Sequence, residues 1–93
     1  GPVTARRMFG GHGIFIDGLM FALVADNVLY IKVDAVAVAD FEAQGMQPFK
    51  YRRKNRWVSL KYYQVPEEAL ESCEQMRIWA NKGVAAALRA AAE

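Results

Sequence analysis

The chain has 93 residues, 54% of them hydrophobic and 24% charged, and its formal net charge at pH 7 is +2. This composition is typical of one folded domain and excludes a disordered chain, while so small a net charge does not by itself indicate a polyanionic partner. A single cysteine and a single histidine exclude an internal disulfide and a His/Cys zinc cluster. No apolar run approaches the roughly 18 residues of a membrane span. We therefore expect one cytoplasmic domain over residues 1–93, with no metal, cofactor or membrane segment.

Residues 7–34 predict a meander of three antiparallel strands. Runs rich in Ile, Phe, Leu, Val and Tyr are separated by the dipeptides Asp17-Gly18 and Asp26-Asn27, which tolerate the positive φ of tight hairpin turns. Two-residue turns at both places fix the register. The predicted pairs are Phe15 with Met20, Ile16 with Leu19, Ala22 with Ile31 and Val24 with Leu29.

This register assigns the side chains of the meander to two faces. One face would include Phe15, Met20, Ala22, Val24 and Ile31, and the other would include Ile14, Phe21, Leu23, Val28 and Tyr30. Both faces are largely apolar, whereas a sheet with one solvated side alternates apolar with polar residues. We therefore expect both faces to be covered, by helices or by a partner chain, and we expect a homodimer.

The segment FGGHG, residues 9–13, is the part of the chain most similar to a glycine-rich phosphate loop. It lacks the G-x-G-x-x-G spacing, no Lys-Ser/Thr follows it, and it runs into a strand instead of a helix N-terminus. We interpret its three glycines as places where the backbone bends or closely crosses another segment.

The segment DAVAVADFEAQG, residues 34–45, predicts a short helix. Asp34 is the expected N-cap, Gly45 is the expected left-handed residue that ends the helix, and Phe41 is expected to pack in the core.

Residues 47–65, QPFKYRRKNRWVSLKYYQV, predict a second hairpin with its turn at Lys54-Asn55. This turn sets Arg52 opposite Trp57 and makes one side of the hairpin apolar. The other side would be polar and basic and would carry Lys50, Arg52, Trp57, Ser59, Lys61 and Tyr63. Six of the twelve basic residues lie between Lys50 and Lys61, and no acidic residue occurs from residue 43 to residue 66.

The C-terminal quarter of the chain predicts two helical segments. Pro66 opens a turn over PEEAL, and Ser72 begins a longer helix through the capping box SCEQ. The fold class is therefore α+β: an antiparallel sheet of about five strands, made of a three-stranded meander plus a hairpin, packed with two to three helices of which one is C-terminal.

The basic hairpin is the candidate binding site. Lys and Arg interleaved with aromatic residues are typical of surfaces that bind phosphates and stack bases. The same pattern fits an ordinary exposed hairpin in which Arg52 stacks on Trp57 and the other cations are solvated. An acidic surface of another protein or of a second subunit is a third candidate ligand. The candidate residues for nucleic-acid or acidic-partner binding are Lys50, Arg52, Arg53, Lys54, Arg56, Trp57, Lys61 and Tyr63.

His12 and Cys73 are the only residues that offer an acid/base group and a thiol nucleophile. A cysteine at a helix start is more often a small packed residue, and the acidic residues lie at expected helix starts or on solvated helix faces. We therefore expect no catalytic residues and no enzyme activity.

Three segments together resemble a known family: RRMFGGHGIFIDGLMFALVADNVLYIKVD, PFKY and WVSLKYYQVPEEAL. In this combination and order the chain, from Arg6 to about Leu88, resembles the N-terminal domain of the TfoX/Sxy family of bacterial competence regulators. The resemblance implies a cytoplasmic, non-enzymatic α+β domain, and in the better-known members a role in switching on DNA-uptake genes together with the cyclic-AMP receptor protein. It also implies a helix upstream, and because the chain opens with GPVTARR and has no initiator methionine, we expect that helix to be missing.

Three hypotheses follow, in this order. The first is a non-catalytic regulatory domain that binds a protein partner in transcription regulation. The second is direct nucleic-acid binding through the hairpin of residues 50–63. The third is a small hydrolase or redox enzyme that uses Cys73 and His12.

Overall fold

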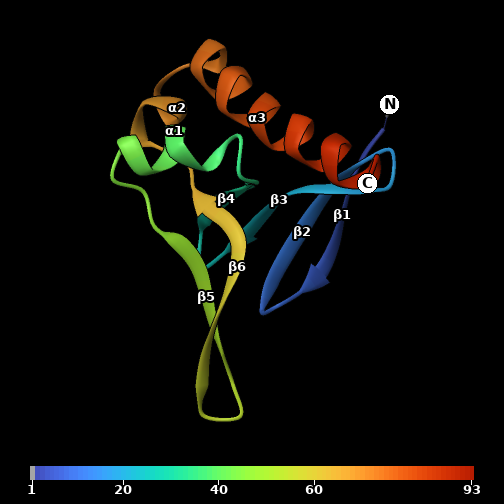
Figure 1. The fold of residues 1–93 in the computed structure, drawn as a ribbon, viewed down its shortest axis with the longest axis vertical. Coiled ribbons are helices and arrows are strands. Elements are labelled where there is room, and N and C mark those ends of the chain that lie inside the picture. Colours follow the sequence, from blue (N-terminus) through green and yellow to red (C-terminus); the bar gives the residue numbers. More distant parts are fainter. Residues whose placement is uncertain (1) are drawn as a thin grey trace.

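The computed structural model describes residues 2–93, and within them six strands form one antiparallel sheet (Figure 1). The strands are β1 (Val3–Met8), β2 (Gly11–Ile16), β3 (Leu19–Ala25), β4 (Val28–Lys32), β5 (Pro48–Arg53) and β6 (Arg56–Gln64). The helices are α1 (Val38–Ala43), α2 (Glu67–Glu71) and α3 (Cys73–Ala91). The spatial order of the strands is β1-β2-β3-β4-β6-β5. The predicted α+β class is therefore confirmed, with one strand more than expected because residues 3–8 pair with β2.

The predicted register of the meander is confirmed at both turns. Phe15 pairs with Met20 and Ile16 with Leu19, and across the next turn Ala22 pairs with Ile31 and Val24 with Leu29. The register shifts between Ile14 and Phe15, however, so Ile14 pairs with Ala22 and Phe21 is an extra residue in β3. The expected face assignment is therefore wrong at this point. Met20 packs with the cluster around Leu23, while Ile14 and Phe21 pack with the cluster around Ala22.

Helix α3 covers one face of the sheet. Its buried Trp79 packs at the edge of the Phe41 ring, with ring centroids 4.9 Å apart, in a cluster that includes Ile31 of β4. Gly83 marks the closest approach of α3 to the sheet: a Cβ placed on it would lie 2.6 Å from the Phe21 carbonyl oxygen. The missing side chain is what lets the helix pack directly on β3 and β4.

The sheet covers its other face by curling on itself. The turn between β1 and β2 reaches the opposite edge strand, where the ring centroids of Phe9 and Tyr51 lie 5.2 Å apart. The enclosed side buries Leu23, Ala25, Phe49 and Tyr62. Both apolar faces are thus covered within one chain, by α3 and by the curl of the sheet. The homodimer stays a prediction. It was expected because both faces of the meander are apolar, and these faces are now covered without a second subunit.

The predicted cap at Ser72, the left-handed Gly45 after α1 and the interpretation of the glycines are confirmed, but the predicted N-cap at Asp34 is wrong. The N-cap of α1 is Ala37, which makes no side-chain capping hydrogen bond, and the Asp34 carboxylate accepts hydrogen bonds from the amides of Val36 and Ala37 in the turn before the helix. Gly45 has a φ of +74°. The Ser72 hydroxyl accepts the amide hydrogen of Gln75 at 3.0 Å, as a cap does. In the FGGHG segment, a Cβ on Gly11 would lie 1.9 Å from the Val24 carbonyl oxygen, so this glycine serves a close backbone approach.

Candidate functional site

The β5–β6 hairpin projects from the body of the domain as a two-stranded ribbon (Figure 1). Its turn lies at Lys54 and Asn55, whose φ values are +51° and +66°, so the predicted turn is confirmed. A turn with both central residues in the left-handed region matches the twist of the strands. Arg52 pairs with Trp57 and Arg53 pairs with Arg56. We use the name basic tip for the distal part of this hairpin, residues 50–57.

The basic tip is exposed along its whole end. Residues 52–57 are all exposed, and Trp57 as a whole residue is 65% accessible. The domain measures 39 Å along its longest axis, which is vertical in Figure 1, and the hairpin forms the lower end of that axis. A partner can therefore reach the basic tip from several sides without a clash with the helices.

Cations lie on both faces of the basic tip. Residues two apart in a strand, and residues paired across strands, share a face, so Lys50, Arg52 and Trp57 lie on one face. Arg53 and Arg56 lie opposite each other on the other face. Lys50, Arg52 and Trp57 were predicted to share the polar, basic face, and Arg53 and Arg56 were predicted either to bind a ligand or to be solvated. In the structure the ribbon carries positive charge on both faces.

The Arg52 guanidinium group is held against the Trp57 ring. The guanidinium carbon of Arg52 lies 5.3 Å from the centroid of the Trp57 ring, in the range of a cation–π contact. The ring thus supports the guanidinium group while leaving its N–H groups free to bind an anion.

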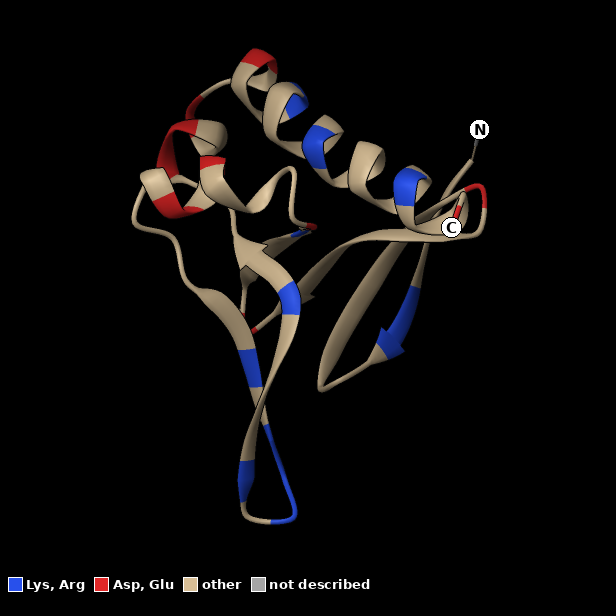
Figure 2. Ribbon diagram, viewed as in Figure 1, with Lys and Arg blue, Asp and Glu red and all other residues tan. Residues whose placement is uncertain are grey.

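The cations of the hairpin have no acidic partner within residues 2–93, because the ion pairs of that part of the chain join Lys82 to Asp40 and Arg89 to Asp34. The hairpin carries Lys and Arg and no acidic residue, whereas α3 carries residues of both signs (Figure 2). Six of the ten acidic residues lie on α1, α2 and the start of α3: Asp40, Glu42, Glu67, Glu68, Glu71 and Glu74. The positive charge of the hairpin therefore remains available to a ligand.

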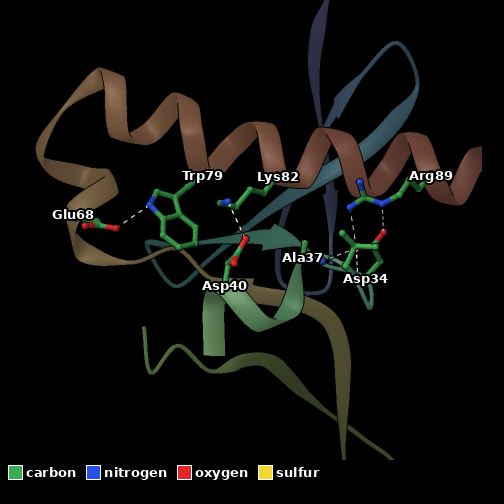
Figure 3. A network of polar contacts seen from close by, with 8 residues as sticks. Asp34, Ala37, Asp40, Glu68, Trp79, Lys82 and Arg89 are labelled. Carbon is green, nitrogen blue, oxygen red and sulfur yellow. Dashed lines mark hydrogen bonds and ion pairs between the residues drawn. The ribbon is translucent and has the colours of Figure 1, made fainter. Parts of the chain in front are cut away.

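Several of these acidic side chains hold the helices together (Figure 3). The Trp79 indole donates a hydrogen bond to Glu68 at 3.2 Å, and Lys82 contacts Asp40 at 2.9 Å. Arg89 binds both carboxylate oxygens of Asp34 and holds the pKa of Asp34 down at about 2. These acidic side chains therefore have a structural role: they connect α1, α2, α3 and the residues before α1.

Two of the predicted site residues lie away from the basic tip. The Tyr63 ring packs against Phe41, and its hydroxyl donates a hydrogen bond to Glu42 at 3.3 Å. Burial, with a smaller contribution from the Glu42 charge, raises the pKa of Tyr63. Lys61 lies at the same end of β6, and its carbonyl oxygen accepts the Val33 amide hydrogen. The structure therefore gathers six predicted residues in the basic tip and separates Lys61 and Tyr63 from them.

The base of the hairpin is anchored by aromatic residues that the sequence analysis did not connect. Phe49 packs at the edge of Tyr30, with ring centroids 5.1 Å apart, and Tyr51 packs against Phe9. Buried Tyr62 donates a hydrogen bond to the Met20 carbonyl oxygen at 3.4 Å, and burial raises its pKa to about 12. The exposed end of the hairpin, residues 52–57, thus projects from a base that is packed in the domain.

The other candidate site does not assemble in this structure. His12 is the second residue of β2, next to the β1–β2 turn, and Cys73 is the first residue of α3. The β1–β2 turn and the start of α3 lie well apart in the fold (Figure 1). Among residues 2–93 no group of three His, Cys, Asp or Glu side chains is placed to hold a metal ion. No helix in that part of the chain has the length and apolar character needed to cross a membrane.

Comparison with known proteins gives two findings. The family described as TfoX N-terminal domain matches residues 1–87. The DNA transformation protein TfoX1 of Aliivibrio fischeri is 37% identical over 67 residues, which are 72% of this chain and 32% of that protein. The chain thus spans about a third of the length of this relative.

Proposed function

The chain belongs to the TfoX N-terminal domain family, and we propose that it is a regulatory domain of bacterial competence that acts without catalysis. In this proposal it binds a negatively charged partner of the transcription apparatus through the basic tip. The similarity to a protein named for DNA transformation supports the role in competence. The basic tip supports binding as the mode of action.

One observation carries the proposal of a binding role. The cations of the basic tip project from the domain, and no carboxylate within residues 2–93 pairs with them. A cluster of like charges raises the energy of the isolated domain and gains favourable interactions only when an anionic surface approaches. We infer that the hairpin retains this charge for a ligand.

The test is a chimera in Aliivibrio fischeri. The region of DNA transformation protein TfoX1 that matches this chain is replaced by residues 1–93 in a strain that lacks the native protein. Transformation frequency and transcript levels of DNA-uptake genes are then measured, with protein levels checked by immunoblot.

Two matched variants make this test specific for the hairpin. The tip variant is Arg53→Gln/Lys54→Gln/Arg56→Gln, and the control variant is Arg6→Gln/Arg7→Gln/Arg77→Gln, which removes three exposed charges elsewhere. We expect the unmodified chimera and the control variant to restore transformation and the tip variant to fail. A normally accumulated chimera that restores nothing would contradict the competence role, and a fully active tip variant would contradict the role of the hairpin.

A further inference from the structure

We propose that the ligand of the basic tip is duplex DNA and that the β5–β6 ribbon enters one of its grooves. This inference rests on the proposed function for the choice of the hairpin as the binding element, and it adds the chemical class of the partner. The alternative ligand with the same charge is the acidic surface of a protein.

The shape of the hairpin fits a groove of duplex DNA. The major groove of B-DNA, about 12 Å wide, admits a two-stranded β-ribbon, and several DNA-binding proteins use such ribbons in the major or minor groove. The β5–β6 hairpin is a two-stranded ribbon that protrudes from the body of the domain (Figure 1). Its exposed end, residues 52–57, has the helices well away from it, so the end can enter a groove before the body meets the backbone of the duplex.

The ribbon carries positive charge on both of its faces. A flat acidic surface of a protein would contact one face of the ribbon. The cations on the opposite face would then make no contact with that partner. A groove in a duplex has phosphates along both of its walls. The basic tip carries Lys50 and Arg52 on one face and Arg53 and Arg56 on the other, with Lys54 at the turn between them. This two-sided arrangement fits a groove better than a flat surface.

Arg53 and Arg56 form a cross-strand pair of like charges. Like charges directly opposite each other across two strands destabilise a hairpin. No carboxylate within residues 2–93 forms an ion pair with either side chain to offset the repulsion. A phosphate bound by both guanidinium groups would remove it, since arginine binds phosphate with two parallel hydrogen bonds.

Trp57 adds an apolar contact to this surface. The whole residue is 65% accessible although it is large and hydrophobic, and one face of its ring is occupied by Arg52. In a groove the free part of the ring can contact sugars or base edges, while Arg52 reaches the phosphates. The ring also provides an intrinsic fluorescent reporter on the basic tip, because the second tryptophan, Trp79, is buried in the core.

The number of cations sets the expected salt dependence. If the five cations of the basic tip each contact a phosphate, the slope of log affinity against log salt is about −4.5, and affinity falls roughly 500-fold between about 50 and 200 mM salt. The tip variant keeps Lys50 and Arg52 and has an expected slope of about −1.8.

The experiment is fluorescence anisotropy of a labelled duplex of about 20 base pairs, titrated with the purified domain at about 50 and 200 mM salt. The same strand without its complement is titrated in parallel. The tip variant and the control variant are compared with the unmodified domain, and circular dichroism checks that all three proteins are folded.

We expect salt-sensitive duplex binding that the control variant retains and that the tip variant loses at about 50 mM salt by roughly tenfold or more. Absence of duplex binding, equal loss in both variants, or tighter binding of the single strand would each overturn the inference. These results are independent of the chimera. A tip variant that fails to restore transformation, in a domain that binds no duplex, would leave the proposed function standing and assign the basic tip to an acidic protein.

Discussion

Arg53 and Arg56 lie directly opposite each other in the last strand pair before the hairpin turn. Two guanidinium groups in this position repel each other, and cross-strand pairs of this kind change stability by about 0.2–1 kcal/mol. We therefore expect the pair to lower the stability of the free domain, and under the proposed function this repulsion is relieved when an anion is bound.

The first prediction concerns this pair. We expect Arg53→Gln to raise the free energy of unfolding in urea by a few tenths of a kcal/mol, roughly, while it weakens duplex binding. Arg77→Gln, an exposed position on α3, is the control and should change neither quantity by much. A less stable Arg53→Gln protein that binds the duplex as well as the unmodified domain would contradict this explanation.

The second prediction concerns the contact between α3 and the sheet. A Cβ on Gly83 would lie 2.6 Å from both the Phe21 carbonyl oxygen and a methyl carbon of Ile31. We expect Gly83→Ala to lower the free energy of unfolding by about 1–3 kcal/mol, because the helix must move away from β3. At an exposed helix position, Gly→Ala would instead stabilise the protein by up to about 1 kcal/mol. A raised unfolding midpoint would therefore contradict the close approach of α3 to the sheet at Gly83.

The third prediction concerns the Asp34–Arg89 ion pair, in which the Arg89 Nε lies 2.6 Å from Asp34 Oδ2. The pKa of Asp34 is lowered from 3.8 to about 2, chiefly by the Arg89 hydrogen bond. A lowered pKa in the folded state means that the charged carboxylate favours folding above pH 4, and that this stability is lost as the pH falls through 2.

Arg89→Gln removes the ion pair and leaves the hydrogen bonds from Asp34 to the amides of Val36 and Ala37. We therefore expect this variant to unfold at a lower temperature than the unmodified domain at pH 7. The difference should shrink as the pH is lowered from about 4 toward 2. Calorimetry at a series of pH values measures it, and a difference that is independent of pH would contradict the assignment.

The fourth prediction concerns Phe9, which has a φ of +51° in the β1–β2 turn and packs against Tyr51. Asn tolerates this backbone conformation better than Phe, so a local effect alone would make Phe9→Asn stabilising. If the ring braces the hairpin, the variant instead loses about 0.5–1.5 kcal/mol and speeds hydrogen exchange at the base of β5. Unchanged exchange there would show that Phe9 does not support the hairpin.

The parts of the fold that depend on local chemistry were predictable from the sequence. The turns at Asp17-Gly18, Asp26-Asn27 and Lys54-Asn55 all adopt the positive φ values that their residues tolerate. Ser72 caps α3, the Asp34 carboxylate binds backbone amides in the turn before α1, and Gly45 follows α1 with positive φ. Each of these features depends on neighbouring residues, and none needs a distant contact.

The parts that depend on distant contacts were not predictable. The bulge that adds Phe21 to β3 moves Met20 to the other face, and the residues on either side carry no signal for it. β1 has two arginines and no alternating apolar pattern, so it was not recognised as a strand. The contact from Phe9 to Tyr51, which closes the sheet, joins residues 42 positions apart. That closure removed the original argument for a dimer.

The candidate site was predicted only in part, because some of its features depend on local sequence and others on distant contacts. The charge excess and the turn can be read directly from residues 50–57, so six of the eight expected binding residues gather in the basic tip. Tyr63 and Lys61 fit the same alternating pattern, but β6 continues into the core, where Tyr63 packs under α1. Strand alternation gives the face of a residue and does not give the point where a neighbouring helix covers that face.

The most direct test of the account is an amide NMR titration of the labelled domain with the duplex at low salt. We predict chemical-shift changes concentrated at residues 50–59, with a shift of the Trp57 indole signal and little change at Trp79 or along α1 and α2. Changes centred on the helices or on the FGGHG segment, or no change at concentrations that saturate the anisotropy, would contradict the claim that the basic tip is the binding surface.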